Sequence, residues 1–400
     1  MNPPSSSIYN LQFWLLCFSN FLFSASFSMM IPELPEHLSN MGGQEYIGYI
    51  IALFTLTAGL ARPFSGKVTD TIGRVPVMAF GSIVCCIGAL CYPFVHVVWA
   101  FLLLRLLHGF STGTKPTATA AYIADIVPEN RRGEAAGMLG IFTATGMSIA
   151  PTMGSYITLW FGINTMFYLA AVFALLSIAI LLNMKETLAE KRPFRLGMLK
   201  IGWEDLFEPR VLAVFIVMFS VSFASGVILT LIPDLSKTLG IENKGLFFTV
   251  YTVASLAVRV FASKVSDTHG RVPVLLFSVV VLAIGMAILG FTQSEFGFWA
   301  AAILFGVSWG LNTPTLTAWT IDLSHPDFRG RALATMYIAL EAGIGVGAWW
   351  SGWWYGGDLS RMSFAFYVSA VLGALSFGYL LWWRNQKAVK VELHGDSRRV

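Results

Sequence analysis

The sequence GKVTDTIGRVPV at Gly66–Val77 returns later in the chain as SKVSDTHGRVPV at Ser263–Val274. The two copies are offset by 197 positions and share an aspartate, a glycine, an arginine and a proline. Each copy follows an apolar run, is rich in charge, and leads into another apolar run. This pattern is typical of a short charged loop between two membrane helices, and its recurrence indicates a transporter-like chain built from two repeated halves.

The composition favours a membrane protein. Of the 400 residues, 56% are hydrophobic and 12% are charged, whereas a soluble globular protein carries about 25% charged residues. Runs long enough to span a bilayer occur at about 11–31, 46–65, 76–95, 98–124, 135–159, 164–184, 211–232, 245–263, 273–292, 297–323, 332–353 and 363–383. We therefore predict an all-α membrane protein with twelve transmembrane helices in two six-helix repeats. The first run lacks a basic segment before it, so we interpret it as an uncleaved span.

A hydrophilic segment near the middle divides the chain. We predict an N-terminal six-helix bundle at 1–184, a cytoplasmic linker at 185–210 and a C-terminal bundle with a cytoplasmic tail at 211–400. The linker can form a short surface helix around Met198–Phe207. Of the 26 lysines and arginines, all but five lie in segments that share one side of the membrane. The positive-inside rule then predicts that both termini are cytoplasmic, and the compact loops favour a bacterial inner membrane.

The duplicated loop resembles the G-x-x-x-D-R-x-G-R-[RK] motif of the major facilitator superfamily, although Thr71 and Val75 replace basic residues. The resemblance covers the whole chain and implies the twelve-helix fold of that family. It also implies a conformational latch between the halves, formed by Gly66, Asp70, Gly73, Arg74, Asp125, Arg131, Arg132, Asp267, Gly270 and Arg271. We expect the aspartates at the helix ends to pair with Arg131, Arg132, Arg329 or the N-terminus of helix 5 or 11.

Two more segments resemble motifs of the same family. LLLRLLHGFSTG at 102–113 resembles the arginine motif of the fourth helix. The fifth run resembles the antiporter motif, G-x8-G-x3-G-P-x2-G-G, at Gly137, Gly146, Ala150, Pro151 and Gly154. This second resemblance implies the drug–proton antiporter branch. The small residues themselves allow close helix packing, and they also fit a pivot or a seam between the halves.

The fourth predicted helix carries a polar stripe. A charge near the middle of a bilayer is costly unless it faces a cavity or a partner. The repeat-related positions in the second half are largely aromatic. We predict a central cavity for an amphipathic organic molecule, lined by Arg105, Lys115, Thr112, Phe305, Trp309 and Asn312. The alternatives are a structural ion pair or an arginine bonded to carbonyl groups, and for His108 a hydrogen-bonded residue instead of a proton carrier.

Glu341 is the one carboxylate deep inside a predicted span, about 13 Å into helix 11. Burial raises the pKa of a carboxyl group unless a cation lies near it. Glu341 is therefore our leading candidate for proton coupling, with His108 as a second candidate and Lys115 or Arg105 as the expected cation. The alternative is a purely structural ion pair. Glu33, Glu36 and Asp234 are interpreted as a solvated outer rim.

We predict a secondary active transporter that moves a small organic solute by alternating access, by proton-coupled efflux. The alternative within transport is a proton symporter that takes up a sugar or an organic acid. A membrane enzyme or a sensor is the remaining alternative, but no cluster of catalytic residues or ligands supports an enzyme. We expect no catalytic residue, no cofactor and no metal, since the four cysteines lie in apolar runs without ligand spacing. The expected partners are the solute, protons and the lipid bilayer, with no nucleic acid, and we expect a monomer.

Overall fold

The computed structural model describes residues 9–128, 131–188, 190, 207–325 and 328–395, without the side chains of 260–264 and 387–395. The first half contains α1 (Leu11–Met30), α2 (Leu34–Asn40), η1 (Gln44–Tyr46), α3 (Ile47–Ile72), α4 (Arg74–Cys91), η2 (Tyr92–Phe94), α5 (Val98–His108), α6 (Phe110–Ile126), α7 (Arg132–Phe161) and α8 (Ile163–Leu182). The second half contains η6 (Pro209–Val211), α9 (Leu212–Thr238), α10 (Leu246–His269), α11 (Arg271–Phe291), α12 (Glu295–Leu323), α13 (Arg329–Tyr355) and α14 (Leu359–Gly395).

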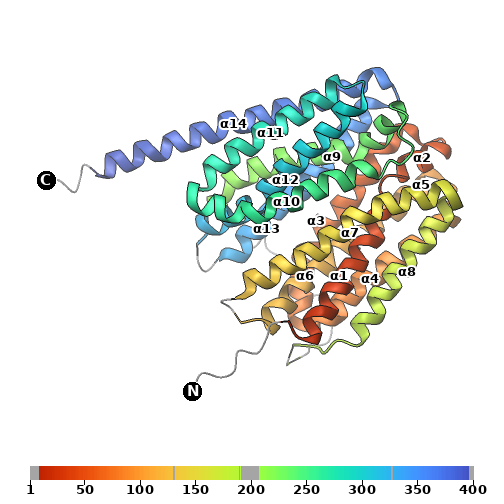
Figure 1. Cartoon of the computed structure of the whole chain (residues 1–400). Helices are drawn as coiled ribbons and strands as arrows, with labels where there is room; N and C mark the ends of the chain where they lie inside the picture. The colour runs from red at the N-terminus through yellow and green to blue at the C-terminus, as the bar shows by residue number, and fades with distance from the viewer. Residues whose placement is uncertain (1–8, 129–130, 189, 191–206, 326–327, 396–400) are drawn as a thin grey trace.

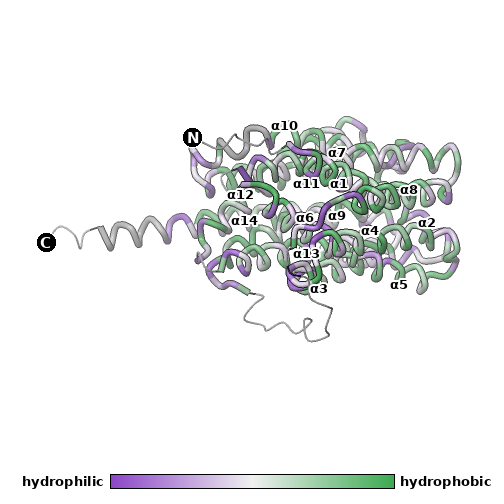
Figure 2. Tube along the Cα trace, turned by 90° about the horizontal axis from the view of Figure 1, so that it is seen from below, coloured by the Kyte–Doolittle hydropathy of each residue, from purple (hydrophilic) through white to green (hydrophobic). Residues whose placement is uncertain are grey.

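The helices correspond to the twelve predicted spans, with α5 and α6 together forming the fourth. Gly109 separates these two helices but keeps right-handed helical angles. Within the described residues, nine helical segments are long and apolar enough to cross a membrane. Figure 2 shows that the helices are hydrophobic along most of their length. The predicted all-α fold is confirmed, whereas all but the last residue of the proposed helix at Met198–Phe207 lies outside the described residues.

The two halves lie side by side, the first from red to yellow and the second from green to blue (Figure 1). Within the first half, α1 contacts α7 and α8, and α4 contacts α6 and α8. Within the second half, α9 contacts α13, and α11 contacts α12 and α14. The main contacts between the halves join α3 to α13 and α7 to α10. These two pairs of helices form the two seams between the halves.

The duplicated loops lie at one end of the bundle, which we call the loop end; the opposite end is the far end. The start of α1 and the end of α14 also point to the loop end (Figure 1). In each loop a glycine with positive φ separates two long helices, Gly73 at 133° and Gly270 at 86°. Only glycine adopts these angles without strain. The two loops therefore turn the chain sharply at equivalent places.

Candidate functional site

Glycines allow α3 and α13 to approach each other closely at the first seam. A Cβ atom at Gly48 would lie 2.5 Å from the carbonyl oxygen of Ala348, and one at Gly352 would lie 2.3 Å from the Cα atom of Gly48. Nearer the loop end, the Cβ atom of Glu341 lies against Gly59. The absence of side chains at these positions brings a carboxylate of the second half against the first half.

Glu341 forms an ion pair with Arg62 across this seam. The Arg62 Nη2 and Nε atoms lie 2.5 Å and 3.1 Å from Glu341 Oε1. The side chains are 22% and 9% exposed, so the pair is largely removed from solvent. The guanidinium group also lies 4.8 Å from the centroid of the Tyr337 ring. Arg62 on α3 is thus held by a carboxylate and an aromatic face that both belong to α13.

The expected partners of Glu341, Lys115 and Arg105, were wrong, because both lie inside the first half. Glu341 also lines a groove of about 800 Å³ between α3 and α13. Leu56, Leu60 and Val346 belong to the groove and are exposed on the surface of the bundle.

The far end of the molecule is closed by charged contacts between the halves. Lys244, which precedes α10, lies 3.0 Å from Glu33 and also pairs with Glu36. Glu33 is only 5% exposed, and it accepts a hydrogen bond from Ser155 at 2.6 Å. Burial lowers the pKa of Lys244, but the two adjacent carboxylates outweigh burial and raise that pKa above its ordinary value. The interpretation of Glu33 as part of a solvated rim was therefore wrong.

The second seam is also closed at the far end. Asn243 donates a hydrogen bond to the carbonyl oxygen of Thr152 at 3.0 Å, and the hydroxyls of Thr152 and Thr249 are 2.7 Å apart. A Cβ atom at Gly245 would lie 2.2 Å from the carbonyl oxygen of Pro151. The backbone of α7 therefore contacts the beginning of α10 directly.

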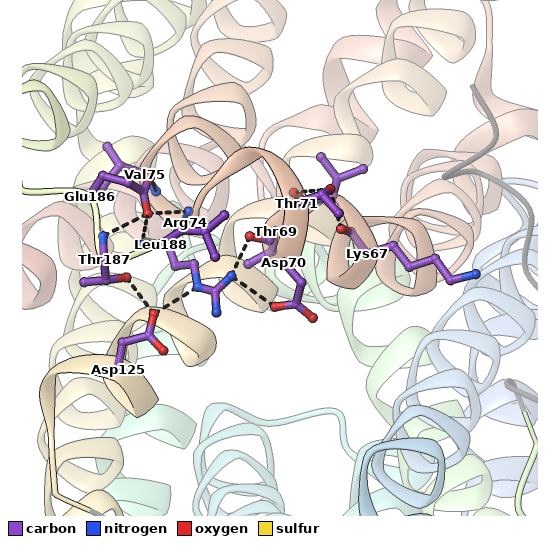
Figure 3. Close-up of polar contacts among 11 residues, drawn as sticks. Lys67, Thr69, Asp70, Thr71, Arg74, Val75, Asp125, Glu186, Thr187 and Leu188 are labelled. Atoms are coloured by element: carbon purple, nitrogen blue, oxygen red, sulfur yellow. Dashed lines mark hydrogen bonds and ion pairs between the residues drawn. The ribbon is translucent and has the colours of Figure 1, made fainter. Parts of the chain in front are cut away.

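At the loop end, Arg74 of the first copy binds Asp70 and Asp125, all within the first half (Figure 3). The guanidinium group of Arg74 lies 3.1 Å from Asp70 and 2.9 Å from Asp125. It also donates a hydrogen bond to the carbonyl oxygen of Thr69 at 2.7 Å. Thr187, from the segment after α8, donates a hydrogen bond to Asp125 at 2.6 Å. Arg74 therefore ties the end of α3 to the end of α6.

Glu186 completes the first loop and was missed by the sequence interpretation. Its carboxylate accepts hydrogen bonds from the backbone amides of Arg74 at 3.0 Å and Val75 at 3.1 Å. Free amides at a helix N-terminus favour an anion, so Glu186 caps α4. A Cβ atom at Gly73 would lie 2.4 Å from this carboxylate. A long-range cap of this kind leaves no short-range signal in the sequence.

The second copy repeats the arginine but not the cap. Arg271 lies 2.9 Å from Asp322 and also pairs with Asp267. It donates a further hydrogen bond to Ser266 at 2.7 Å. A Cβ atom at Gly270 would approach no closer than 3.8 Å to Pro273. The second loop thus holds the same ion pairs with fewer additional contacts.

The expected pairing of Asp125 with Arg131 or Arg132 was wrong. Arg131 lies 2.9 Å from Glu134, and Arg132 donates a hydrogen bond to the carbonyl oxygen of Ala124 at 2.8 Å. Both arginines therefore bind partners that are close in sequence instead of Asp125. A Cβ atom at Gly66 would meet no atom within 4 Å, so this conformation imposes no packing constraint there.

Lys115 is completely buried inside the first half and does not line the predicted cavity. Its ammonium group donates hydrogen bonds to the hydroxyls of Ser19 at 2.9 Å, Ser82 at 3.0 Å and Ser177 at 2.5 Å. It also lies 4.7 Å from the ring centroid of Phe23. These residues belong to α1, α4 and α8, so Lys115 points into the six-helix bundle. A polar stripe on one helix has the same spacing whether it faces a cavity or a bundle interior.

Arg105 and His108 are buried in the same half. Arg105 donates hydrogen bonds to the carbonyl oxygen of Ile50 at 2.9 Å and to the hydroxyl of Tyr92 at 3.3 Å. His108 contacts the same hydroxyl through Nδ1 at 3.2 Å and Cys85 Sγ through Nε2 at 3.4 Å. The structure favours the alternative of a carbonyl-bonded arginine and places His108 inside a hydrogen-bonded cluster.

The other residues predicted for the cavity also lie apart from the groove at Glu341. Phe305 is buried and stacks on Trp309, with ring centroids 6.0 Å apart. Asn312 is buried and donates a hydrogen bond to Ser308 at 3.0 Å. Thr112 donates to the carbonyl oxygen of Gly109 at 3.3 Å. None of these residues lines the groove between α3 and α13.

The antiporter-like motif of α7 faces three different surroundings. Cβ atoms at Gly146 and Gly154 would lie 2.3 Å from Ser24 Oγ and 2.4 Å from the carbonyl oxygen of Met29, both on α1. Ala150 is buried, and Pro151 meets the start of α10 at the second seam. A Cβ atom at Gly137 would meet no atom within 4 Å. The motif therefore combines packing within the first half with contact between the halves.

The family model of the Major Facilitator Superfamily matches residues 16–246 and 214–399, so the chain belongs to this family. It is a multi-pass membrane transporter and not an enzyme. The chain is 26% identical over 351 residues to the "Multi-drug resistance efflux pump PmrA homolog" of Lactococcus lactis, covering 84% of this chain and 85% of that relative.

Two further comparisons agree with this assignment. The chain is 27% identical to the "Multidrug resistance protein MdtG" of Serratia proteamaculans, with 76% of each chain covered. The crystal structure of the nucleoside transporter NupG has a TM-score of 0.75 at 13% identity, covering 93% of this chain and 98% of that chain. The structural similarity shows the shared fold.

Proposed function

We propose that this transporter exports a small amphipathic organic solute from a bacterial cytoplasm in exchange for protons. It then lies in the inner membrane with the loop end and both termini in the cytoplasm, as the distribution of lysine and arginine predicts. The relatives named as efflux pumps support export over uptake. One chain supplies both halves and both seams, so the proposal needs only a monomer.

The Arg62–Glu341 ion pair is the observation that carries this proposal. The carboxylate of Glu341 is shielded from solvent and joins the two halves directly. A change in its charge would therefore change how strongly the halves are held together. Protonation of Glu341 would remove its attraction to Arg62 and weaken the first seam. A ligand, here a proton, shifts a conformational equilibrium only by binding the two states differently. Glu341 meets that requirement if α3 and α13 separate in the other state.

Closure of the far end supports the assignment of this structure to one state of the alternating-access cycle. The Lys244 cluster and the Thr152–Thr249 contact hold the halves together there, while the charged pairs of both loops stay within their own halves. In our proposal this is the state that exposes the solute site to the cytoplasm. Opening the far end requires separation of Lys244 from Glu33 and Glu36. Formation of the latch at the loop end, with Gly66 against the other half, would accompany it.

Transport by Glu341→Gln in proteoliposomes with an imposed proton gradient tests the proposal. The amide cannot carry a proton, so solute movement against its own gradient should stop, while exchange of solute down its gradient continues. Glu341→Asp, which keeps a titratable group, is the matched control and should retain part of the uphill transport. Uphill transport by Glu341→Gln would show that another group couples the proton. Solute movement in the same direction as the protons would favour uptake by symport instead.

A further inference from the structure

The two seams carry the same arginine in different surroundings. Arg62 on α3 corresponds to Arg259 on α10 at the repeat offset of 197 residues. Arg62 is held by the Glu341 carboxylate and the face of the Tyr337 ring, both on α13. The positions on α7 that correspond to Tyr337 and Glu341 are Gly140 and Ala144. The second seam therefore keeps the cation and lacks both of the groups that bind it at the first.

The guanidinium group of Arg259 is incompletely hydrogen-bonded. Its Nε atom is buried and has no hydrogen-bond partner among the described residues. An arginine remains charged at any physiological pH, and burying that charge without a partner is costly. Asp267, the nearest carboxylate along the chain at the loop end, does not supply the missing negative charge, because it is paired with Arg271.

The facing helix does not supply a carboxylate either. The acidic residue of α7 is Glu134, which is bound by Arg131 and accepts a hydrogen bond from Tyr9 at 2.5 Å. Glu134 lies ten residues from Ala144, a helical rise of about 15 Å. Movement of α7 toward α10 would bring Ala144 to Arg259 if the second seam closes as the first does. In this structure α7 therefore offers Arg259 no carboxylate partner among the described residues.

Between its contacts at the far end and the loop end, α7 has open space beside it. Ser148 and Thr152 contact Thr249 of α10 near the far end. Gly137 and Ala144 lie on the same helical face as these residues, at spacings of four, seven and eight. A Cβ atom at Gly137 or Gly140 would meet no atom within 4 Å. The seam is thus open beside α7 as it runs toward the loop end.

We propose that Arg259 binds the carboxylate of an anionic solute, with the aromatic or other flat apolar part of that solute against Gly140 and Ala144. The solute would take the places that Glu341 and Tyr337 occupy around Arg62. Arginine suits this role because its planar fork binds carboxylates with two parallel hydrogen bonds and its face accepts a ring. The substrate class is therefore an amphipathic aromatic carboxylate. This inference rests on the proposed transport of an organic solute.

Thermal unfolding of the purified full-length protein with 2-naphthoate, and with the uncharged isostere 2-naphthamide, tests the assignment. We expect 2-naphthoate to raise the midpoint of unfolding of the parent protein and 2-naphthamide to raise it less. Arg259→Met should weaken 2-naphthoate binding by about tenfold or more, because a charge-assisted pair is lost. Arg259→Lys should restore part of the binding.

A second pair of variants keeps Arg259 and tests whether its guanidinium group must be free to bind the solute. Ala144→Glu places a carboxylate where Glu341 stands at the other seam, and should displace 2-naphthoate. Ala144→Gln has the same size without the charge and should retain binding more strongly than Ala144→Glu. Equal binding of the acid and the amide, no binding of the acid, or equal effects of the Glu and Gln variants would overturn the assignment.

These outcomes can be separated from those of the coupling experiment. The unfolding assay is carried out on the parent protein and the Arg259 and Ala144 variants without a proton gradient, so it reports 2-naphthoate binding whether or not Glu341 couples the proton. Loss of 2-naphthoate binding with intact proton-driven transport of a neutral solute would remove the anion site and leave the transporter proposal standing.

Discussion

Arg62 and Arg259 occupy equivalent positions, yet Arg62 is paired with a carboxylate and the Nε atom of Arg259 has no hydrogen-bond partner among the described residues. Within each half, the helix that carries the arginine packs in the same way against a glycine of the same half. A Cβ atom at Gly109 would lie 2.1 Å from the carbonyl oxygen of Phe54, and one at the equivalent Gly306 would lie 2.2 Å from that of Tyr251. Backbone contacts have thus stayed symmetric while charges have diverged. The difference shows that a repeated helical frame can carry unlike chemistry at its two seams.

The interiors of the two halves differ in the same way. Lys115 lies among three serine hydroxyls, whereas the equivalent Asn312 hydrogen-bonds Ser308 and its Oδ1 atom has no partner among the described residues. The first half therefore encloses a cation among hydroxyl groups, whereas the second half holds an uncharged amide at the equivalent position.

The largest expected effect concerns the duplicated loops. Arg74→Ala should lower transport by about tenfold or more, and Arg271→Ala should lower it less, with both proteins still in the membrane. Arg74 ties α3 to α6, and the first loop is also held by Glu186 and Thr187 from beyond α8. The second loop has no equivalent side-chain cap among the described residues. Initial transport rates normalised to membrane protein check this. Equal losses of transport in the two variants would show that the extra contacts of the first loop do not contribute to transport.

A smaller effect is expected from the two buried polar residues. Lys115→Met should destabilise the protein by about 1–3 kcal/mol, because it leaves buried hydroxyls without their donor. Asn312→Leu should be close to neutral, since it removes an amide that is already incompletely bonded. Thermal unfolding in detergent compares them. A Lys115→Met protein of parental stability that no longer binds solute would support the cavity role predicted from the sequence.

The smallest effect concerns the pH dependence of stability that comes from Glu208, at the start of the second half. Glu208, just before η6, accepts a hydrogen bond from Arg331 at 3.0 Å. This bond lowers the pKa of Glu208 below its ordinary value, although burial opposes the shift. The resulting stability is present above the unfolded-state pKa of about 4.3 and is lost as the pH falls through the lower folded-state pKa.

We expect Glu208→Gln to lose about 1 kcal/mol or less at pH 7, because Arg331 is partly exposed to solvent. The difference in unfolding midpoint between this variant and the parent should shrink as the pH falls toward 3. A difference that stays constant over that range would mean that the carboxylate charge makes no contribution. Glu134, bound by Arg131 and Tyr9 in the first half, offers the matched variant Glu134→Gln.

The sequence by itself determined the number of spans, the duplication and the family. These depend on hydrophobic runs and short motifs, and each of them is a local property of the chain. The charged loop around Gly73 followed for the same reason. Every predicted span has a helical counterpart in the structure.

Only the tertiary structure decided which charges meet. The partner of Glu341 is Arg62, 279 residues away, and the cap of α4 is Glu186, 112 residues from Arg74. Such pairs depend on the rotation of each helix about its own axis, which a single sequence leaves open. Helical spacing placed Lys115 and Arg105 on one polar face but could not say whether that face meets a cavity or a bundle interior, because burial against polar neighbours satisfies the same residues equally well.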